Sequence, residues 1–149
     1  MYEYGAFMEG GKIIDGDSIR LGYLDLGFNV RLYNQSVRFF GIDTPESYGT
    51  RRKDPVEYQF GMLAKQYVVD HLTKSFTLKT HKDAKGKFGR ILGEPIVYIP
   101  EFDQEMSICK VMVIKHLAVE YHGQSKDDIK EEHLKNREIL YEQGLVLRG

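Results

Sequence analysis

Three short segments place acidic and basic side chains at turns, where they could act on a phosphate ester. These segments are Asp15–Ser18, Val37–Glu46 and Lys87–Arg90. Within them, Asp17 and Asp43 supply hard oxygen ligands, which suit Ca²⁺ or Mg²⁺ when a main-chain carbonyl and water complete the coordination. The acidic pair therefore indicates a candidate metal site. A plain turn explains the same Asp-Gly-Asp sequence, because aspartate is common in turns for its own backbone hydrogen bonds.

In these segments, two arginines could bind a phosphate, and one glutamate could activate the water that attacks it. Arg38 and Arg90 carry planar guanidinium groups that match phosphate oxygens in pairs, and Glu46 could act as a general base. Each has an ordinary alternative, because exposed arginines and solvated loop carboxylates are common, and Asp43 could instead cap a helix that follows it. No residue taken alone decides between the alternatives.

The strands that must position these residues can be predicted from the sequence pattern. Short runs rich in β-branched and aromatic residues, bounded by polar turns, are typical of strands. They predict strands over residues 12–14, 18–21, 28–32, 37–40, 75–81 and 96–99. Pro45 ends the first strand region, because proline cannot donate to a strand ladder.

Helices are predicted between and after the strands. Apolar residues from Phe60 to Leu72 recur at helical spacing, which predicts a helix with one apolar face. A second helix is predicted over about residues 106–116. A third begins at Ser125, which forms a capping box with Asp128, and ends near Gly144. This order of elements favours an α+β fold in which a small curved barrel carries helices on its outside.

The composition limits the class of protein. The chain has 149 residues, 42% of them hydrophobic, which is typical of one globular domain over residues 1–149. Cys109 is the single cysteine, which excludes an internal disulfide and a cysteine-based zinc finger. The 5 histidines show no metal-ligand spacing, so we expect them to have structural roles. Neither a secretory signal nor a membrane span is evident, so we expect a cytoplasmic protein that binds no membrane.

Charge is unevenly distributed along the chain. The formal net charge is −1, which taken alone argues mildly against a polyanionic partner. Residues 31–90, however, hold 12 Lys and Arg against 6 Asp and Glu, whereas the flanking segments are net acidic. Because electrostatic steering depends on the local field, this basic segment could follow a phosphate backbone, or it could be a solvated face.

Taken together, the three segments resemble the staphylococcal nuclease family. The shared features are Asp-Gly-Asp-Ser in the first hairpin, Val-Arg-x-x-x-Ile-Asp-Thr-Pro-Glu at residues 37–46, and Lys-Phe-Gly-Arg at residues 87–90. The likeness continues at His116-Leu117-Ala118 and at residues 131–134, so it covers roughly residues 12–146. The sequences at residues 25–28 and 121–123 look most like the phage and prophage branch of that family.

This resemblance implies a five-stranded OB-fold (oligonucleotide-binding) β-barrel with three flanking α-helices. It also implies a Ca²⁺-dependent nuclease that acts on DNA and RNA, single- or double-stranded, with little sequence preference. The family cuts the P–O5′ bond and leaves a 3′-phosphate. Mg²⁺ or Mn²⁺ could replace Ca²⁺, and we expect a monomer. If the protein is encoded by a phage, its compartment would be the host cytoplasm.

The resemblance also assigns a role to each candidate site residue. The metal ligands that it implies are Asp17, Asp43 and the main-chain carbonyl of Thr44. The phosphate-binding and catalytic residues that it implies are Arg38, Glu46 and Arg90. Asp15 would orient metal-bound water, Lys87 would hold a neighbouring phosphate, and Tyr121 would stack on a base or bind a phosphate.

Departures from the family pattern leave a second function open. Phe88 stands where tyrosine is usual, Cys109 where asparagine is frequent, and His116 where glycine is common. The alternative is a catalytically silent nucleic-acid-binding module on the same OB-fold. Such relatives lack one of the acidic or arginine residues named above. This chain retains all of them, which favours catalysis.

Overall fold

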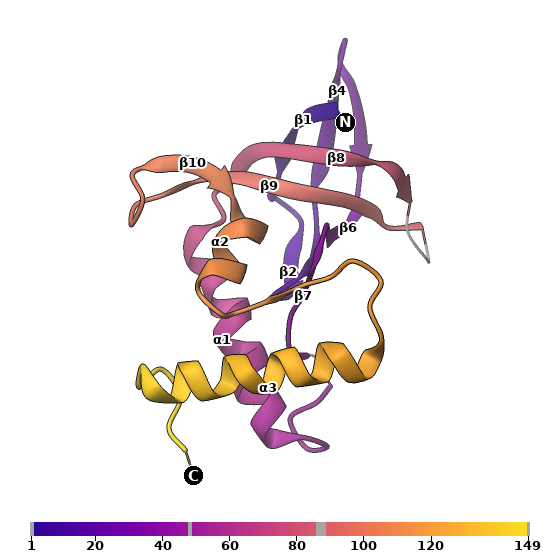
Figure 1. Ribbon diagram of the computed structural model, residues 1–149. Coiled ribbons are helices and arrows are strands. Elements are labelled where there is room, and N and C mark those ends of the chain that lie inside the picture. The colour runs from indigo at the N-terminus through magenta and orange to yellow at the C-terminus, as the bar shows by residue number, and fades with distance from the viewer. Residues whose placement is uncertain (1, 48, 86–88, 149) are drawn as a thin grey trace.

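In the part of the chain that the structure describes, seven strands come first, and the three helices then alternate with the remaining four strands (Figure 1). The computed structural model describes residues 2–47, 49–85 and 89–148, with the side chains of residues 82–85 left aside. Its strands are β1 (Tyr2–Phe7), β2 (Lys12–Asp15), β3 (Ser18–Arg20), β4 (Tyr23–Gly27), β5 (Val30–Tyr33), β6 (Ser36–Phe39), β7 (Ile42–Asp43), β8 (Ser75–Lys85), β9 (Ile91–Ile99), β10 (Gln104–Ser107) and β11 (Val119–Glu120). Its helices are α1 (Pro55–His71), α2 (Ile108–Ile114) and α3 (Lys126–Glu142).

Most of the strands form one curved sheet. Their order is β2-β3-β6-β9-β8-β1-β4-β5, and β10 pairs with β9. β1 and β2 are neighbours along the chain but lie in different parts of this order, and the same holds for β3 with β4 and for β5 with β6. A short connection of two to four residues joins the members of each pair and redirects the chain, and with β8 and β9 these strands make the sheet of an α+β fold. The predicted fold class is confirmed.

Glycines allow two connections between strands to approach each other closely: Gly11 lies between β1 and β2, and Gly22 lies between β3 and β4. A Cβ atom at Gly11 would overlap the carbonyl oxygen of Arg20, and one at Gly22 would overlap the carbonyl oxygen of Glu9. The N–H group of Gly22 donates a 2.8 Å hydrogen bond to the carbonyl of Phe7. The backbones approach so closely at the bend that only glycine fits there.

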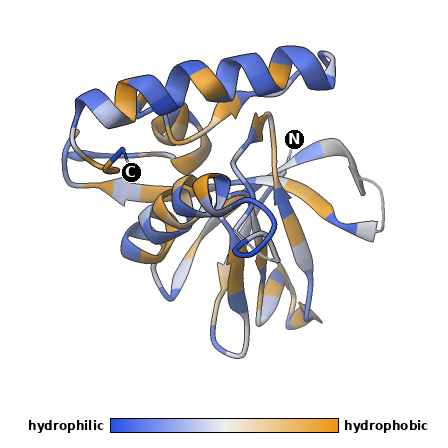
Figure 2. Ribbon diagram, turned by 90° about the horizontal axis from the view of Figure 1, so that it is seen from below, coloured by the Kyte–Doolittle hydropathy of each residue, from blue (hydrophilic) through white to orange (hydrophobic). Residues whose placement is uncertain are grey.

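The helices cover one end of the sheet and pack on one another. α1 runs away from the sheet beside β2, and α3 crosses the far end of α1 (Figure 1). The Phe60 ring of α1 meets the Tyr141 ring of α3 edge-on, with 5.3 Å between ring centroids. α3 is largely hydrophilic with short hydrophobic bands (Figure 2), and Leu140 is its one buried residue among those described. No described helix is long and apolar enough to cross a membrane.

Buried side chains from the sheet and from the first two helices make the core. The largest fully buried apolar side chains are Ile19, Leu21, Val37, Phe39, Phe60, Val68, Leu78, Ile99, Ile108, Val111 and Met112. Cys109 joins them at 2% exposure, and burial raises the pKa of its thiol. This thiol is an inert packing group.

The helix caps follow the sequence signals. Asp54 caps α1 by accepting a 3.0 Å hydrogen bond from the N–H of Glu57, and Pro55 takes the first helical position. Ser125 caps α3 by accepting a 3.1 Å hydrogen bond from the N–H of Asp128. Gly144 follows the end of α3 at a φ of +73°, the left-handed conformation that ends many helices.

Several boundaries differ from the prediction. β1 and β4 lie where no strand was predicted, and β1 has a single buried residue, so its sequence lacks a clear alternation. The second predicted helix over residues 106–116 was too long, because Gln104–Ser107 pairs with β9 as a strand. α1 begins at Pro55, five residues or so before its first buried side chain. In each case tertiary pairing or capping decided what local pattern could not.

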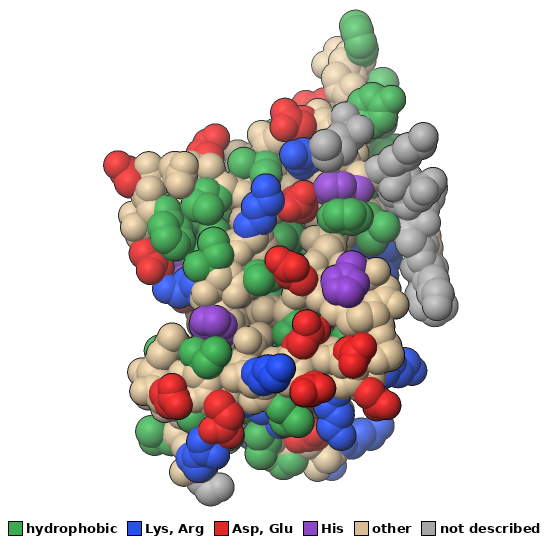
Figure 3. Space-filling view, in the orientation of Figure 1, with side chains coloured by type: hydrophobic (Ala, Val, Ile, Leu, Met, Phe, Trp, Pro, Cys, Tyr) green, Lys and Arg blue, Asp and Glu red, His purple; other side chains and the backbone are tan. Residues whose placement is uncertain are grey.

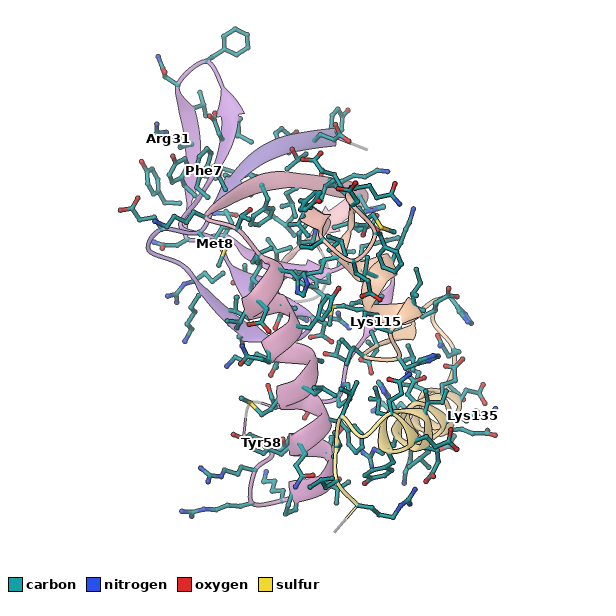
Figure 4. All side chains as sticks on the ribbon, turned by 90° about the vertical axis from the view of Figure 1, so that its left-hand side faces the viewer. Phe7, Met8, Arg31, Tyr58, Lys115 and Lys135 are labelled. Carbon is teal, nitrogen blue, oxygen red and sulfur yellow. The ribbon has the colours of Figure 1, made fainter. Side chains whose placement is uncertain are left out.

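The hairpin of β4 and β5 projects beyond the rest of the sheet (Figure 4). Arg31 lies along this hairpin, with its guanidinium carbon 4.5 Å from the centroid of the Tyr23 ring. Phe28 occupies the tip, fully exposed and at a positive φ. β5 ends the strand order of the sheet and pairs only with β4 among the described strands.

Gly22→Ala should destabilise the fold through the bend, because its Cβ would meet the backbone of Glu9. We expect a loss of about 2 kcal/mol or more in the free energy of unfolding, as for other overpacked sites. Denaturant unfolding followed by circular dichroism measures this. Gly5→Ala is the matched control, because a Cβ there meets only an ordinary 3.4 Å contact with Phe7. Equal stability of the two variants would contradict the role given to Gly22.

Candidate active site

The guanidinium group of Arg38 lies between two carboxylates from different parts of the chain. Its Nη1 atom is 3.3 Å from Oδ2 of Asp17, and its Nη2 atom is 3.6 Å from Oδ1 of Asp43. Strand pairing produces this arrangement, because Ser18 of β3 lies opposite Arg38 of β6. The side chains of Arg38, Asp17 and Asp43 are 19%, 14% and 33% exposed. Arg38 thus contacts two of the predicted acids, Asp17 from the first motif and Asp43 from its own.

Asp17 is the more enclosed of the two carboxylates. Its Oδ2 atom accepts a 3.1 Å hydrogen bond from the N–H of Thr44. Burial raises the pKa of Asp17, while the charge of Arg38 and the Thr44 N–H offset part of that rise and the charge of Asp43 adds to it. This enclosed carboxylate shares one arginine with a second acid, so a further cation would stabilise its charged form.

A close contact with α1 fixes the turn that carries Asp15 and Asp17. Gly16, between them, is buried, and a Cβ there would come within 2.8 Å of the Cβ of Ala64. Asp15 accepts hydrogen bonds from the backbone N–H of Ser47, at 3.3 Å, and from its hydroxyl. The predicted Asp-Gly-Asp turn is therefore present, and its glycine allows close packing against α1. Asp15 and Asp17 both accept hydrogen bonds from the segment that follows β7.

Glu46 lies at the exposed edge of this segment. Burial and the nearby negative charges of Glu57, Asp15, Asp43 and Asp17 raise its pKa. The Glu46 backbone is held by the hydroxyl of Thr50, which donates a 2.9 Å hydrogen bond to its carbonyl. Helix α1 packs directly against that carbonyl, because Gly61 has no side chain and a Cβ there would overlap the carbonyl oxygen. A carboxylate with a raised pKa at a cavity edge has the properties of a general base.

Part of this group lines a cavity of about 770 Å³, while Asp15 and Asp17 lie outside its lining. Besides Arg38, Asp43, Thr44 and Glu46, it is lined by Arg90 and Tyr121. Arg90 reaches it because β6 and β9 pair in parallel with Arg38 opposite Leu92. Tyr121, 47% exposed, reaches it because its N–H donates a 2.8 Å hydrogen bond to the carbonyl of Gly41. Lys87 lies outside the described residues.

One face of α3 forms the wall of the cavity that sequence analysis missed. Its residues there include Lys126, Lys130, His133 and Arg137, whose spacing is that of a single helix face. They belong to a net acidic segment, and the surface over α3 carries acidic and basic side chains next to one another (Figure 3). The net charge of the segment gives no sign of these basic residues, because acidic residues outnumber them, whereas their helical spacing would have placed them on one face.

The donor set suits a hard divalent cation in part. Asp17 and Asp43 offer carboxylate oxygens on either side of one guanidinium group. The hydroxyl Oγ1 of Thr44 is buried beside them, with no hydrogen-bond partner among the described residues. Two carboxylates with a carbonyl or hydroxyl leave positions for water, as Ca²⁺ and Mg²⁺ tolerate. The described residues hold no group of three or more His, Cys, Asp or Glu side chains arranged for a metal.

Comparison with known proteins assigns the chain to a family. Residues 36–141 match the family described as "Staphylococcal nuclease homologue". This match spans more than half of the chain and includes Arg38, Asp43, Glu46 and Arg90. The chain therefore belongs to the staphylococcal nuclease family, and the resemblance noted in its motifs is confirmed.

A curated relative supports the same assignment. Endonuclease YhcR of Bacillus subtilis (strain 168) is 35% identical to this chain over 89 residues. The matched region covers 57% of this chain and 7% of the relative. This chain thus corresponds to a small part of that protein.

Gly61→Ala should displace Glu46 from the cavity edge. Its Cβ would overlap the Glu46 carbonyl and lie 2.8 Å from the nitrogen of Ser47, so the backbone must shift. In a helix, alanine normally gains about 1 kcal/mol over glycine. We expect instead a lower melting temperature and a loss of about 10-fold or more in the catalytic activity of this candidate site, by analogy with other small misplacements near reacting groups. Gln59→Ala, at an exposed position of the same helix, is the control and should change neither.

Proposed function

We propose that this protein is a Ca²⁺-dependent nuclease that hydrolyses phosphodiester bonds of DNA and RNA with little sequence preference. The observation that carries the proposal is the contact of Arg38 with both Asp17 and Asp43, in a cavity shared with Glu46 and Arg90. Family membership and the endonuclease relative support it. An electropositive group between two acids, beside a base, is suited to phosphoryl transfer.

The metal would be held by Asp17, Asp43 and the main-chain carbonyl of Thr44. Bound there, Ca²⁺ would polarise the phosphate and neutralise charge that develops on it. Asp15 would orient water next to this site, a role consistent with its ties to Ser47. Mg²⁺ and Mn²⁺ prefer similar oxygen ligands and are candidate substitutes.

Side chains of the protein would accept the proton of the attacking water and bind the phosphate. Glu46, whose pKa is raised by burial and neighbouring acids, accepts a proton from the attacking water. Arg38 and Arg90 bind the phosphate oxygens and stabilise the negative charge that grows there. The bond from phosphorus to O5′ breaks and the leaving O5′ oxygen takes a proton from water, so one product ends in a 3′-phosphate and the other in a 5′-hydroxyl.

The cavity also has the surface that a nucleic acid strand requires. Tyr121 offers a half-exposed ring on which a base can stack. Lys126, Lys130 and Arg137 add positive charge from α3 to that of the two arginines. Lys87 would hold a neighbouring phosphate.

Ca²⁺ should be required for cleavage. We expect denatured DNA to be cut with Ca²⁺ and left intact with EGTA, measured by gel electrophoresis of end-labelled strands. The new ends should become extendable by a polymerase only after phosphatase treatment, because a 3′-phosphate blocks extension. Binding without cleavage under both conditions would favour a catalytically silent nucleic-acid-binding module on the same fold.

Arg90→Ala should lower kcat by about 100-fold or more, since a single charge-stabilising donor contributes that much in other enzymes. Arg90 is the better test of the pair, because Arg38 also compensates the buried Asp17 and its loss would unpair that carboxylate. Arg148→Ala is the control, because Arg148 is exposed and pairs with Glu138 away from the cavity. Wild-type turnover in the Arg90 variant would contradict its assignment.

A further inference from the structure

A histidine from the last helix is bonded to one of the proposed metal ligands. Nε2 of His133 lies 2.7 Å from Oδ2 of Asp43, and the His133 side chain is 12% exposed. An ionised carboxylate can only accept, so Nε2 carries the hydrogen and donates it. The other oxygen of Asp43 faces Arg38 at 3.6 Å. Both oxygens of this carboxylate therefore have a partner on a different element.

The backbone that carries His133 is held in place by several contacts along α3. Asn136 donates a 3.2 Å hydrogen bond to the carbonyl of Ala118. One turn further on, Leu140 is 2% exposed and Tyr141 packs on Phe60 of α1. These contacts fix the position of the helix relative to β11, whose Val119 pairs with Asp43 of β7. His133 is thus presented to Asp43 from a rigid support, as a preset donor requires.

We propose that His133 is a positioning residue that sets the orientation of the Asp43 carboxylate for a divalent cation. The inference rests on the proposed function. With its Oδ2 atom bonded to Nε2, the carboxylate cannot rotate about its Cβ–Cγ bond without breaking that hydrogen bond. Its rotamer is therefore selected before a cation arrives, and less ordering remains to be done on binding.

Two other roles for His133 are less consistent with the geometry. As a metal ligand through Nε2 it would have to give up the hydrogen that this atom donates to Asp43. As a purely structural link between α3 and β7 it would be redundant, because Asn136 and the packing of Leu140 and Tyr141 already join α3 to the rest of the fold.

The test measures Ca²⁺ affinity directly, by isothermal titration calorimetry of the full chain without nucleic acid. His133→Ala should weaken Ca²⁺ binding by about 10-fold or more, as loss of such supporting partners does at other metal sites. His133→Gln keeps an N–H donor near the position of Nε2, and its affinity should lie within about threefold of wild type. His122→Ala is the matched control, because His122 is exposed and outside the cavity, and its affinity should be unchanged.

Kinetics and stability separate positioning from a structural role. In His133→Ala, the Ca²⁺ concentration for half-maximal cleavage should rise by the same factor as the dissociation constant, while kcat at saturating Ca²⁺ stays near wild type. A lower melting temperature with unchanged Ca²⁺ affinity would overturn the inference, and so would failure of His133→Gln to restore binding. If wild type itself neither binds Ca²⁺ nor cleaves, the proposed function fails instead.

Discussion

The arrangement of the site depends on one charged contact. Arg38 offsets part of the negative charge of two carboxylates that the fold has brought together, and one of them, Asp17, is largely enclosed. Without that cation, two acids in a cavity would repel each other and one would have to be buried as a bare charge, which is costly. The chain meets this constraint by placing Arg38 on β6, in the middle of the sheet, where β3 and β9 flank it. Arg90 then follows from the same parallel pairing.

Small residues on α1 and in the turns translate this charge balance into a fixed geometry. Gly16 lets the Asp-Gly-Asp turn touch Ala64, and Gly61 lets the segment after β7 touch the helix. The backbone that carries the acids in these two segments is therefore packed as closely as a protein core, and the positions of the acids are fixed more tightly than those of loop residues. Because of this close packing, a methyl group added at either glycine would shift the backbone and the carboxylates together. Such a substitution would therefore change both the stability of the fold and the geometry of the site.

Sequence alone predicted the class of fold and the grouping of the motifs, but not the full wall of the cavity. Asp17, Arg38 and Asp43 could be grouped because turns and short strands mark each of them, and the family resemblance set their order. His133 could not, because a lone histidine on a polar helix has no local pattern, and its partner lies 90 residues away. The β1 strand was missed for a related reason, since long-range pairing with β8 and β4 forms it. Lys126 and Lys130 were obscured by the acidic residues around them.

The use of α3 as a wall of the cavity has a consequence for how the molecule is made. A chain leaves the ribosome from its N-terminus, so Asp17, Arg38 and Asp43 emerge long before His133. Until α3 docks, the acids lack one side of their enclosure, and contacts this distant in sequence form slowly because a long loop must close first. Synthesis therefore yields the proposed catalytic groups early and the finished pocket late. A site built this way reaches its final geometry only when nearly the whole domain has been translated.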